Sequence, residues 1–169
     1  MYFTLFQHLS LLGGALYSNI MLKVGDKMPH FEVVNQNGEL VTSEQLLGRK
    51  TIIYFYPKDN TSGCTAEACS LRDNYAELTE RGYNVVGVSK DGTASHRKFI
   101  DKYDLPFTLL ADTTTQMLQD FGAWGEKSMY GRKYMGVLRR TFIFDEQGVL
   151  TDIIEKVDTK NHASQILAL

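Results

Sequence analysis

The amino-acid sequence predicts an α/β fold, in which helices flank a central mixed β-sheet and a β-hairpin comes first. Strand-like apolar runs alternate with helical patterns from residue 51 to residue 121, and this alternation is typical of parallel strands joined by helices. Before that region, two short strand-like runs are separated by Asn37-Gly38, which is a strong hairpin signal. After it, two more strand-like runs are joined by a turn at residues 145–148.

Local patterns of apolar residues predict the individual elements, and the sequence contains no internal repeat. Strands are expected at residues 31–35, 39–42, 51–56, 84–89, 107–110, 139–144 and 149–155. Helices are expected at about 63–81, at 94–103 with Thr93 as cap and Pro106 as stop, at 114–121 and at 161–167. Residues 123–138 contain three glycines and no clear periodicity, so we expect a long loop there. This order of elements suits a thioredoxin-like sandwich.

Composition limits the classes of function. The chain has 169 residues, 43% hydrophobic and 22% charged, as expected for one soluble globular domain with a full core. A net charge of −2 gives no reason to expect nucleic acid or an anionic membrane as a partner. Two closely spaced cysteines do not make a secreted disulfide scaffold and fit a reducing cytoplasm. The four histidines lack metal-site spacing, and no phosphate loop or dinucleotide motif occurs, so we expect no metal and no cofactor.

Residues 1–20 differ from the rest of the chain. They are apolar but contain no lysine or arginine, and polar residues such as Gln7 and His8 interrupt the run. A signal peptide needs a basic start, and a spanning helix needs about 20 apolar residues, so neither fits well. We therefore interpret residues 1–20 as an N-terminal extension of uncertain role, either an added arm or the product of an upstream start codon. The folded domain is expected at residues 21–169.

One stretch carries the chemistry. An apolar strand pattern at residues 51–56 ends at Pro57, and a polar turn leads to Cys64 at the start of a helical pattern. Unpaired backbone N–H groups and the positive end of the helix dipole favour a thiolate over a thiol at such a position. Thr61 or Ser62 can cap the helix. Cys64 is therefore expected to be nucleophilic.

The second cysteine lies on another face of the same predicted helix. At about 100° per residue, Cys64 falls on the apolar face and Cys69 lies about 140° away, on the polar side. The alternative interpretation is that both are inert, buried small residues, as free cysteines usually are. The helix start and the polar-face position favour a reactive pair.

The string YFYPKDNTSGCTAEACSLRD resembles the active-site signature of the peroxiredoxins, Pro-x-x-x-Thr-x-x-Cys, matched by Pro57, Thr61 and Cys64. It is more narrowly similar to the bacterioferritin comigratory protein group, or Q-type peroxiredoxins, in which a second cysteine stands five residues after the first, as Cys69 does. The strings FTLLAD, FGAWGEK and RRTFIFD are further matches, and together they cover nearly everything from residue 21 onward. Ser62 departs from the proline that the family usually has there, which affects the rigidity of the loop rather than the chemistry.

The resemblance implies a thioredoxin-like fold and a thioredoxin-dependent thiol peroxidase. In that interpretation Cys64 is the peroxidatic nucleophile that attacks hydrogen peroxide or an organic hydroperoxide. Cys69 is the resolving cysteine of an intramolecular disulfide, which thioredoxin or a similar dithiol reductant opens. Thr61 orients the peroxide, Pro57 screens the thiolate from water, and Arg139 adds positive charge. Members of the group are often monomers, so a monomer is expected.

Other interpretations remain open at this stage. The chain could be a thiol–disulfide oxidoreductase, although those enzymes typically show Cys-x-x-Cys, or a non-enzymatic redox sensor or holdase whose disulfide switches a surface. Arg139 could be a strand-edge residue in solvent. Five basic residues between 125 and 140, namely Lys127, Arg132, Lys133, Arg139 and Arg140, could suggest a nucleic-acid surface, but a solvated loop near an anion-binding site fits better.

Overall fold

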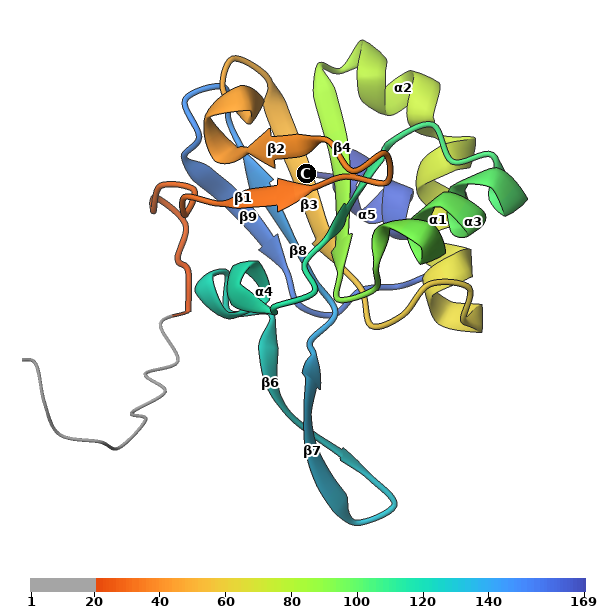
Figure 1. Ribbon diagram of the computed structural model, residues 1–169. Helices are drawn as coiled ribbons and strands as arrows, with labels where there is room; N and C mark the ends of the chain where they lie inside the picture. The colour runs from red at the N-terminus through yellow and green to blue at the C-terminus, as the bar shows by residue number, and fades with distance from the viewer. Residues whose placement is uncertain (1–20) are drawn as a thin grey trace, which may run out of the picture.

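The computed structural model describes residues 21–169, and the extension predicted at residues 1–20 lies outside them. A five-stranded mixed sheet forms the centre, with strand order β5-β4-β3-β8-β9 (Figure 1). Its strands are β3 (Lys50–Phe55), β4 (Tyr83–Ser89), β5 (Thr108–Ala111), β8 (Arg140–Phe144) and β9 (Leu150–Ile154). The first three pair in parallel, whereas β8 is antiparallel to both β3 and β9. This confirms the predicted mixed sheet and its parallel part.

Side chains of the central strand β3 alternate between the two faces of the sheet. Ile53 and Phe55 belong to one hydrophobic cluster, and Ile52 and Tyr54 belong to the other. Both sets are buried because β3 has a strand on each side and a packed layer on each face, so the sequence reads as a continuous apolar run.

Helices cover one face of the sheet. They are α1 (Ser62–Asp73), α2 (Tyr75–Glu80), α3 (Thr93–Tyr103) and α5 (His162–Leu167) (Figure 1). Their buried residues, among them Leu71, Leu78, Phe99 and Ile166, pack on the strand residues of that face. The predicted helix 94–103 is confirmed, but it begins at Thr93, and Gly92 rather than Thr93 holds the N-cap position.

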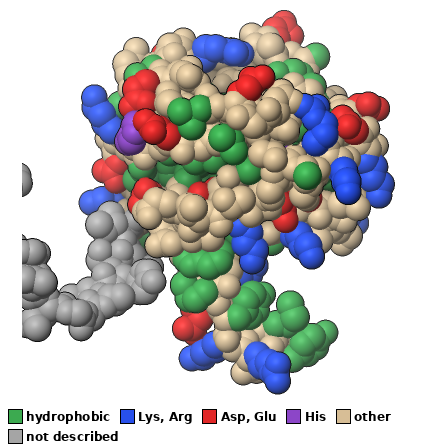
Figure 2. All heavy atoms as spheres, viewed as in Figure 1, with side chains coloured by type: hydrophobic (Ala, Val, Ile, Leu, Met, Phe, Trp, Pro, Cys, Tyr) green, Lys and Arg blue, Asp and Glu red, His purple; other side chains and the backbone are tan. Residues whose placement is uncertain are grey.

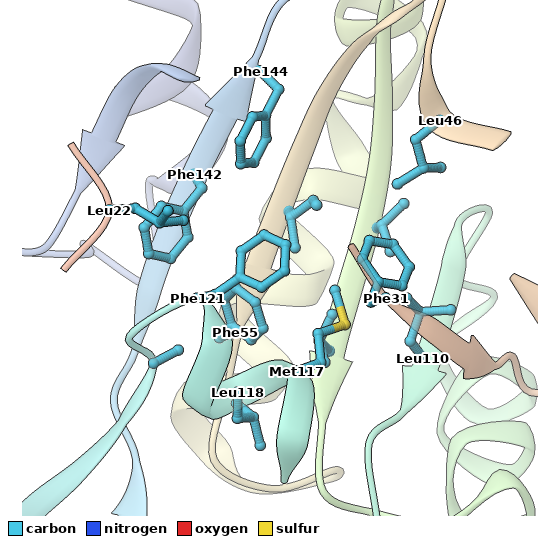
Figure 3. Packing of buried hydrophobic residues seen from close by; sticks show 14 of the residues in the cluster. Leu22, Phe31, Leu46, Phe55, Leu110, Met117, Leu118, Phe121, Phe142 and Phe144 are labelled. Atoms are coloured by element: carbon cyan, nitrogen blue, oxygen red, sulfur yellow. The ribbon is translucent and has the colours of Figure 1, made fainter. Parts of the chain in front are cut away.

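The opposite face is covered by the N-terminal hairpin and a short helix. These elements are β1 (Glu32–Val34), β2 (Leu40–Thr42), the 3-10 turn η1 (Ser43–Leu46) and α4 (Gln116–Asp120). In Figure 3, Phe121 at the end of α4 lies among aromatic side chains of the sheet, with its ring centroid 5.3 Å from Phe55 and 6.0 Å from Phe142. The Asn37-Gly38 hairpin is confirmed, with Val33 paired to Val41.

The prediction of one continuous helix at about 63–81 is wrong, because the helix is interrupted at Asn74. Asn74 separates α1 from α2 with φ −112° and ψ 13°, and its side-chain amide donates to Ser70 O at 2.9 Å. Asparagine competes with the helical backbone through such local bonds, which the periodicity of the apolar residues does not reveal.

The loop predicted at residues 123–138 is also wrong, because this segment forms a β-hairpin. Strands β6 (Trp124–Met129) and β7 (Arg132–Val137) pair along their whole length and extend away from the body (Figure 1). The turn residues Tyr130 and Gly131 both have positive φ, 50° and 76°, as a type I′ turn requires. Most residues of the hairpin are exposed on both faces, so no alternation of apolar and polar residues marks the strands. Figure 2 shows its hydrophobic and basic side chains standing clear of the main body.

No helix within residues 21–169 combines the length and hydrophobicity needed to cross a membrane.

The helix predicted at 114–121 is shorter than expected, since Thr115 takes a left-handed conformation with φ 65° before α4 begins. The predicted C-terminal strands and helix are confirmed.

Candidate active site

The end of β3 and the start of α1 position Cys64. The chain leaves the sheet at Tyr56 and Pro57, and α1 begins with Thr61 as its N-cap, so Cys64 lies in the first turn and is only 1% exposed. The first hydrogen bond of the helix runs from Thr65 N to Thr61 O at 2.8 Å. The N–H groups of Gly63 and Cys64 therefore precede the helical ladder and are directed to the helix start, where negative charge is favoured.

Thr61 holds the N-cap position but does not cap the helix with its side chain. Its hydroxyl donates instead to Lys58 O at 2.8 Å, across the tight turn that contains Asn60 at φ 59°. The expected side-chain cap is therefore absent. With its proton directed to Lys58 O, the hydroxyl oxygen keeps its lone pairs for another donor.

Arg139 approaches Cys64 from the segment between β7 and β8. Its Nη2 lies 3.3 Å from Cys64 Sγ, and its Nη1 donates to Glu67 Oε1 at 2.7 Å. The guanidinium passes over Gly63, where a Cβ atom would lie 3.3 Å from Nη2. The structure thus brings Arg139 to the thiol rather than into solvent, and Arg140 turns elsewhere, donating to Gly122 O at 2.7 Å.

Glu67 is a buried carboxyl that sequence reasoning missed. It lies one turn after Cys64 on the core face of α1, and its side chain is 0% exposed. The pKa of Glu67 is raised to about 7, because the effect of burial exceeds the opposite effects of the charge and the hydrogen bond of Arg139. The sequence did contain a signal for it, because Glu67 falls on the same helix face as the apolar residues Ala68 and Leu71.

A second polar cluster lies under the loop before α1, and no spacing in the sequence suggested it. Asp59 Oδ1 accepts from the Tyr56 hydroxyl at 2.6 Å, while Oδ2 lies 2.8 Å from Ser95 Oγ and 2.7 Å from His96 Nδ1. His96 Nε2 faces Leu110 O at 2.8 Å. Both ring nitrogens of His96 thus face acceptor oxygens, and its buried contact with Asp59 fixes the loop.

Lys127 also contributes to the electrostatics of the site. It is half-buried on β6, and its Nζ donates to Val137 O at 2.9 Å. The pKa of Lys127 is lowered overall. Burial is the largest cause and the charge of Arg139 adds to it, while the charge of Cys64 acts in the opposite direction. Lys127 is therefore part of the surroundings of the thiol and not of a solvated loop.

Comparison with known proteins decides which family shares this arrangement. A sequence model of the AhpC/TSA family matches residues 24–153. The chain belongs to the AhpC/TSA family.

The relatives within this family are peroxiredoxins. Peroxiredoxin Bcp of Escherichia coli strain K12 is 41% identical over 146 residues, which are 86% of this chain and 94% of that protein. Peroxiredoxin Bcp of Bacillus subtilis is 38% identical over 146 residues, 86% of this chain and 93% of that protein. These matches confirm the resemblance to the bacterioferritin comigratory protein group, and the chain is a peroxiredoxin, an enzyme that reduces peroxides with a thiol.

Solved structures give the same result for the fold. The bacterioferritin comigratory protein of Xanthomonas campestris has a TM-score of 0.77 at 32% identity, covering 82% of this chain and 88% of that one. Peroxidoxin BcpB of Mycobacterium tuberculosis has a TM-score of 0.77 at 32% identity, covering 87% and 95%. The thioredoxin-like fold is thereby confirmed.

The second thiol of this peroxiredoxin lies on the same helix as the first. Cys64 and Cys69 are both free, and Cys69 is half-buried. Both belong to the unbroken helix α1, where five residues give about 7.5 Å of rise and about 4.3 Å across the axis, hence Cα atoms about 8.7 Å apart. A disulfide needs less than about 7 Å between Cα atoms. The two thiols cannot join while α1 is intact.

Proposed function

We propose that Cys64 is the peroxidatic nucleophile of this peroxiredoxin. The observation that carries the proposal is the contact of 3.3 Å between Arg139 Nη2 and Cys64 Sγ, at the start of a helix. A guanidinium and first-turn N–H groups both stabilise a thiolate over a thiol. The attacking species is therefore an anion in a site from which water is largely excluded.

The first half of the cycle is attack on a peroxide. Thiolate sulfur forms a bond to the terminal peroxide oxygen, the O–O bond breaks, and water or an alcohol leaves as Cys64 becomes a sulfenic acid. Arg139 and the N–H groups of Gly63 and Cys64 face the oxygens on which negative charge develops. Thr61, with its own proton committed to Lys58 O, accepts the hydrogen bond of the peroxide O–H. Pro57 shields the thiolate from solvent.

The second half of the cycle uses Cys69. The sulfenic acid condenses with the Cys69 thiol to an intramolecular disulfide and releases water, for which the start of α1 must unwind. Thioredoxin or a similar dithiol then reduces the disulfide by exchange. We propose that this cycle runs in a monomer in the reducing cytoplasm, with hydrogen peroxide and organic hydroperoxides as substrates. The bacterioferritin comigratory protein of Xanthomonas campestris has alkyl peroxide reduction activity, which supports the second class of substrate.

Steady-state peroxide consumption tests this proposal. Protein, thioredoxin, thioredoxin reductase and NADPH are mixed with hydrogen peroxide, and NADPH oxidation is followed. Wild type should turn over continuously, Cys64→Ser should be inactive, and Cys69→Ser should stop after about one equivalent of peroxide. Equal residual turnover in both variants would overturn the division of roles.

The same assay separates the two alternatives. A redox sensor or holdase would consume about one equivalent of peroxide and then stop, even with the reductant present. A thiol–disulfide oxidoreductase would reduce a disulfide substrate faster than it reduces peroxide. Replacing hydrogen peroxide with an alkyl hydroperoxide in the same mixture gives the substrate preference.

A further inference from the structure

The loop between β4 and α3 lies beside the loop that carries Thr61. Because β3 and β4 are parallel, both loops leave the same end of the sheet (Figure 1). The first loop contains Asp91, and the second runs from Pro57 to Thr61. The backbone N–H of Asp59 donates to Asp91 Oδ2 at 2.9 Å, so a hydrogen bond to a carboxylate joins the two loops.

The peptide unit between Lys58 and Asp59 makes a hydrogen bond at each end. Its N–H donates to Asp91 Oδ2, and its carbonyl oxygen accepts the Thr61 hydroxyl at 2.8 Å. A peptide unit is planar and rigid, so holding its N–H also holds the direction of its C=O. A charged acceptor on the N–H polarises the unit and strengthens the carbonyl oxygen as an acceptor. Asp91 therefore acts on the Thr61 hydroxyl through a single peptide unit.

Asp91 is itself held in this orientation. Its Oδ2 accepts the Ser89 hydroxyl at 2.7 Å, and its backbone N–H donates to Ser89 Oγ at 3.1 Å. Ser89 is 0% exposed at the end of β4. Within residues 21–169 the carboxylate makes its hydrogen bonds with Asp59 and Ser89 and none with α3, whose N-cap is Gly92. The Asp91 side chain is therefore directed to the neighbouring loop and not to the helix that follows it.

The direction of the Thr61 hydroxyl decides what it does for a peroxide. A hydroxyl rotates about its C–O bond and donates to the acceptor that is best placed. Thr61 is exposed, so water competes with Lys58 O for its proton. A proton held on Lys58 O leaves the hydroxyl as an acceptor only, which is the role that the proposed function gives it.

We propose that Asp91 is a positioning residue of peroxide reduction, which holds the Lys58–Asp59 peptide so that the Thr61 hydroxyl accepts the O–H of the peroxide. The proposal rests on the role of Thr61 in the proposed function. It is independent of Cys69 and of the reductant.

Helix α3 holds the loop residues that follow the same peptide bond. The Asp59 carboxylate contacts His96 at 2.7 Å, and His96 lies in α3. The Asn60 side-chain oxygen accepts the Tyr103 hydroxyl at 3.0 Å, from the end of the same helix. Asn60 takes a left-handed conformation with φ 59°, which asparagine tolerates better than most residues. The loop is therefore fixed from α3 at two consecutive residues, so that the peptide before them has little freedom of its own.

The thiolate has separate supports. Arg139 contacts Cys64 Sγ at 3.3 Å and Glu67 Oε1 at 2.7 Å. His162 of α5 lies 3.5 Å from the other oxygen of that carboxylate. These groups come from α1, α5 and the segment before β8, whereas Asp91 follows β4. A change at Asp91 should therefore alter the handling of peroxide and leave the thiolate as it is.

Two reactions of Cys64 separate these effects. All variants carry Cys69→Ser, so that a single thiol is measured after rapid mixing. Hydrogen peroxide has an O–H for Thr61 to accept, whereas methyl methanethiosulfonate has none and converts the thiolate to a methyl disulfide with release of methanesulfinate. Asp91→Ala should slow the reaction with peroxide about tenfold or more and leave the rate with the thiosulfonate within about twofold, because only the first depends on the placement of Thr61.

Matched variants control for the loss of a carboxylate and of stability. Asp91→Asn keeps an acceptor oxygen for the Asp59 N–H and should retain most of the peroxide rate. Ser89→Ala removes the hydroxyl that orients Asp91 and should lower the peroxide rate less than Asp91→Ala does, with the thiosulfonate rate again unchanged. Asp101→Ala removes an exposed carboxylate of α3 that pairs with Arg97, and it should behave as the parent.

A double-variant cycle shows whether Asp91 acts through Thr61. Thr61→Val removes the hydroxyl, so the orientation that Asp91 supports is already lost. The double variant Asp91→Ala/Thr61→Val should therefore be no slower with peroxide than Thr61→Val alone. A purely structural role of Asp91 predicts instead that the two losses multiply, and that result would overturn the inference.

The remaining outcomes distinguish the inference from the proposed function. Equal loss of both rates in Asp91→Ala, or an unchanged peroxide rate, would overturn the inference and leave Cys64 as the nucleophile. Should Asp91→Ala not fold, Ser89→Ala decides by the same two rates. A parent protein that reacts with the thiosulfonate but not with peroxide would overturn the proposed function and, with it, the inference.

Discussion

Formation of the 64–69 disulfide should unwind α1, and the size of the effect follows from what the helix loses. Opening removes Leu71 from the core, which costs about 1.5–3 kcal/mol, and breaks the charged hydrogen bond between Arg139 and Glu67, worth about 1.5–3 kcal/mol. Amides of α1 should therefore exchange about 10²–10⁴ times faster in the oxidised protein, since each 1.4 kcal/mol is a factor of about ten.

Hydrogen exchange followed by mass spectrometry on reduced and oxidised protein measures this directly. The loss of protection should be confined to α1 and its immediate contacts, among them Tyr103, whose carbonyl oxygen accepts a hydrogen bond from Arg72 of α1 at 2.7 Å. Strand β3 should be unchanged, because it is held by neighbouring strands on both sides. Peroxide-treated Cys69→Ser, which cannot form the disulfide, should keep its protection. Full protection of α1 in protein that demonstrably carries the disulfide would refute the reasoning.

Three further predictions concern the surroundings of the thiol. Gly63→Ala should push the Arg139 guanidinium away and slow peroxide reduction about tenfold, while thermal stability stays equal or rises, because alanine favours a helix by about 1 kcal/mol. The pKa of Glu67 is raised in the folded protein, so the stability that comes from its protonation is fully present below pH 4.5 and is lost as the pH rises through about 7. Between these two pH values the unfolding free energy of the wild type should fall by about 3 kcal/mol relative to that of Glu67→Gln, as measured by urea titrations. Asp59→Ala should lower the free energy of unfolding by about 3–5 kcal/mol, because it leaves His96 buried without its partner. The double variant Asp59→Ala/His96→Ala should lose less unfolding free energy than the sum of the two single variants.

The sequence predicted those elements whose surroundings are apolar. The run at residues 51–56 is buried on both faces, so its composition alone indicated a central strand, and Pro57 marked its end. The placement of Cys64 at a helix start followed from the same local signals. Such elements are predictable because the hydrophobic pattern and the local turn chemistry agree.

The elements that escaped prediction depend on contacts that no local pattern encodes. The β6–β7 hairpin is exposed on both faces, so its strands show no alternation, and only its turn at Gly131 carried a signal. Arg139 and His162 reach the site because β8 pairs with β3 and α5 packs on α1, which is a property of the topology. Asp59 and His96 are 37 residues apart and meet for the same kind of reason.

Chemical trapping of the oxidised sulfur tests the central claim, that Cys64 in its contact with Arg139 is the atom that attacks peroxide. Cys69→Ser protein is treated with about one equivalent of hydrogen peroxide in the presence of dimedone, which adds to sulfenic acids, and the peptides are separated by mass spectrometry. We predict one adduct, on the peptide containing Cys64, and a much slower reaction in the Arg139→Met variant. An adduct that forms equally fast without Arg139, or that is found on Cys69 in Cys64→Ser protein, would contradict the claim.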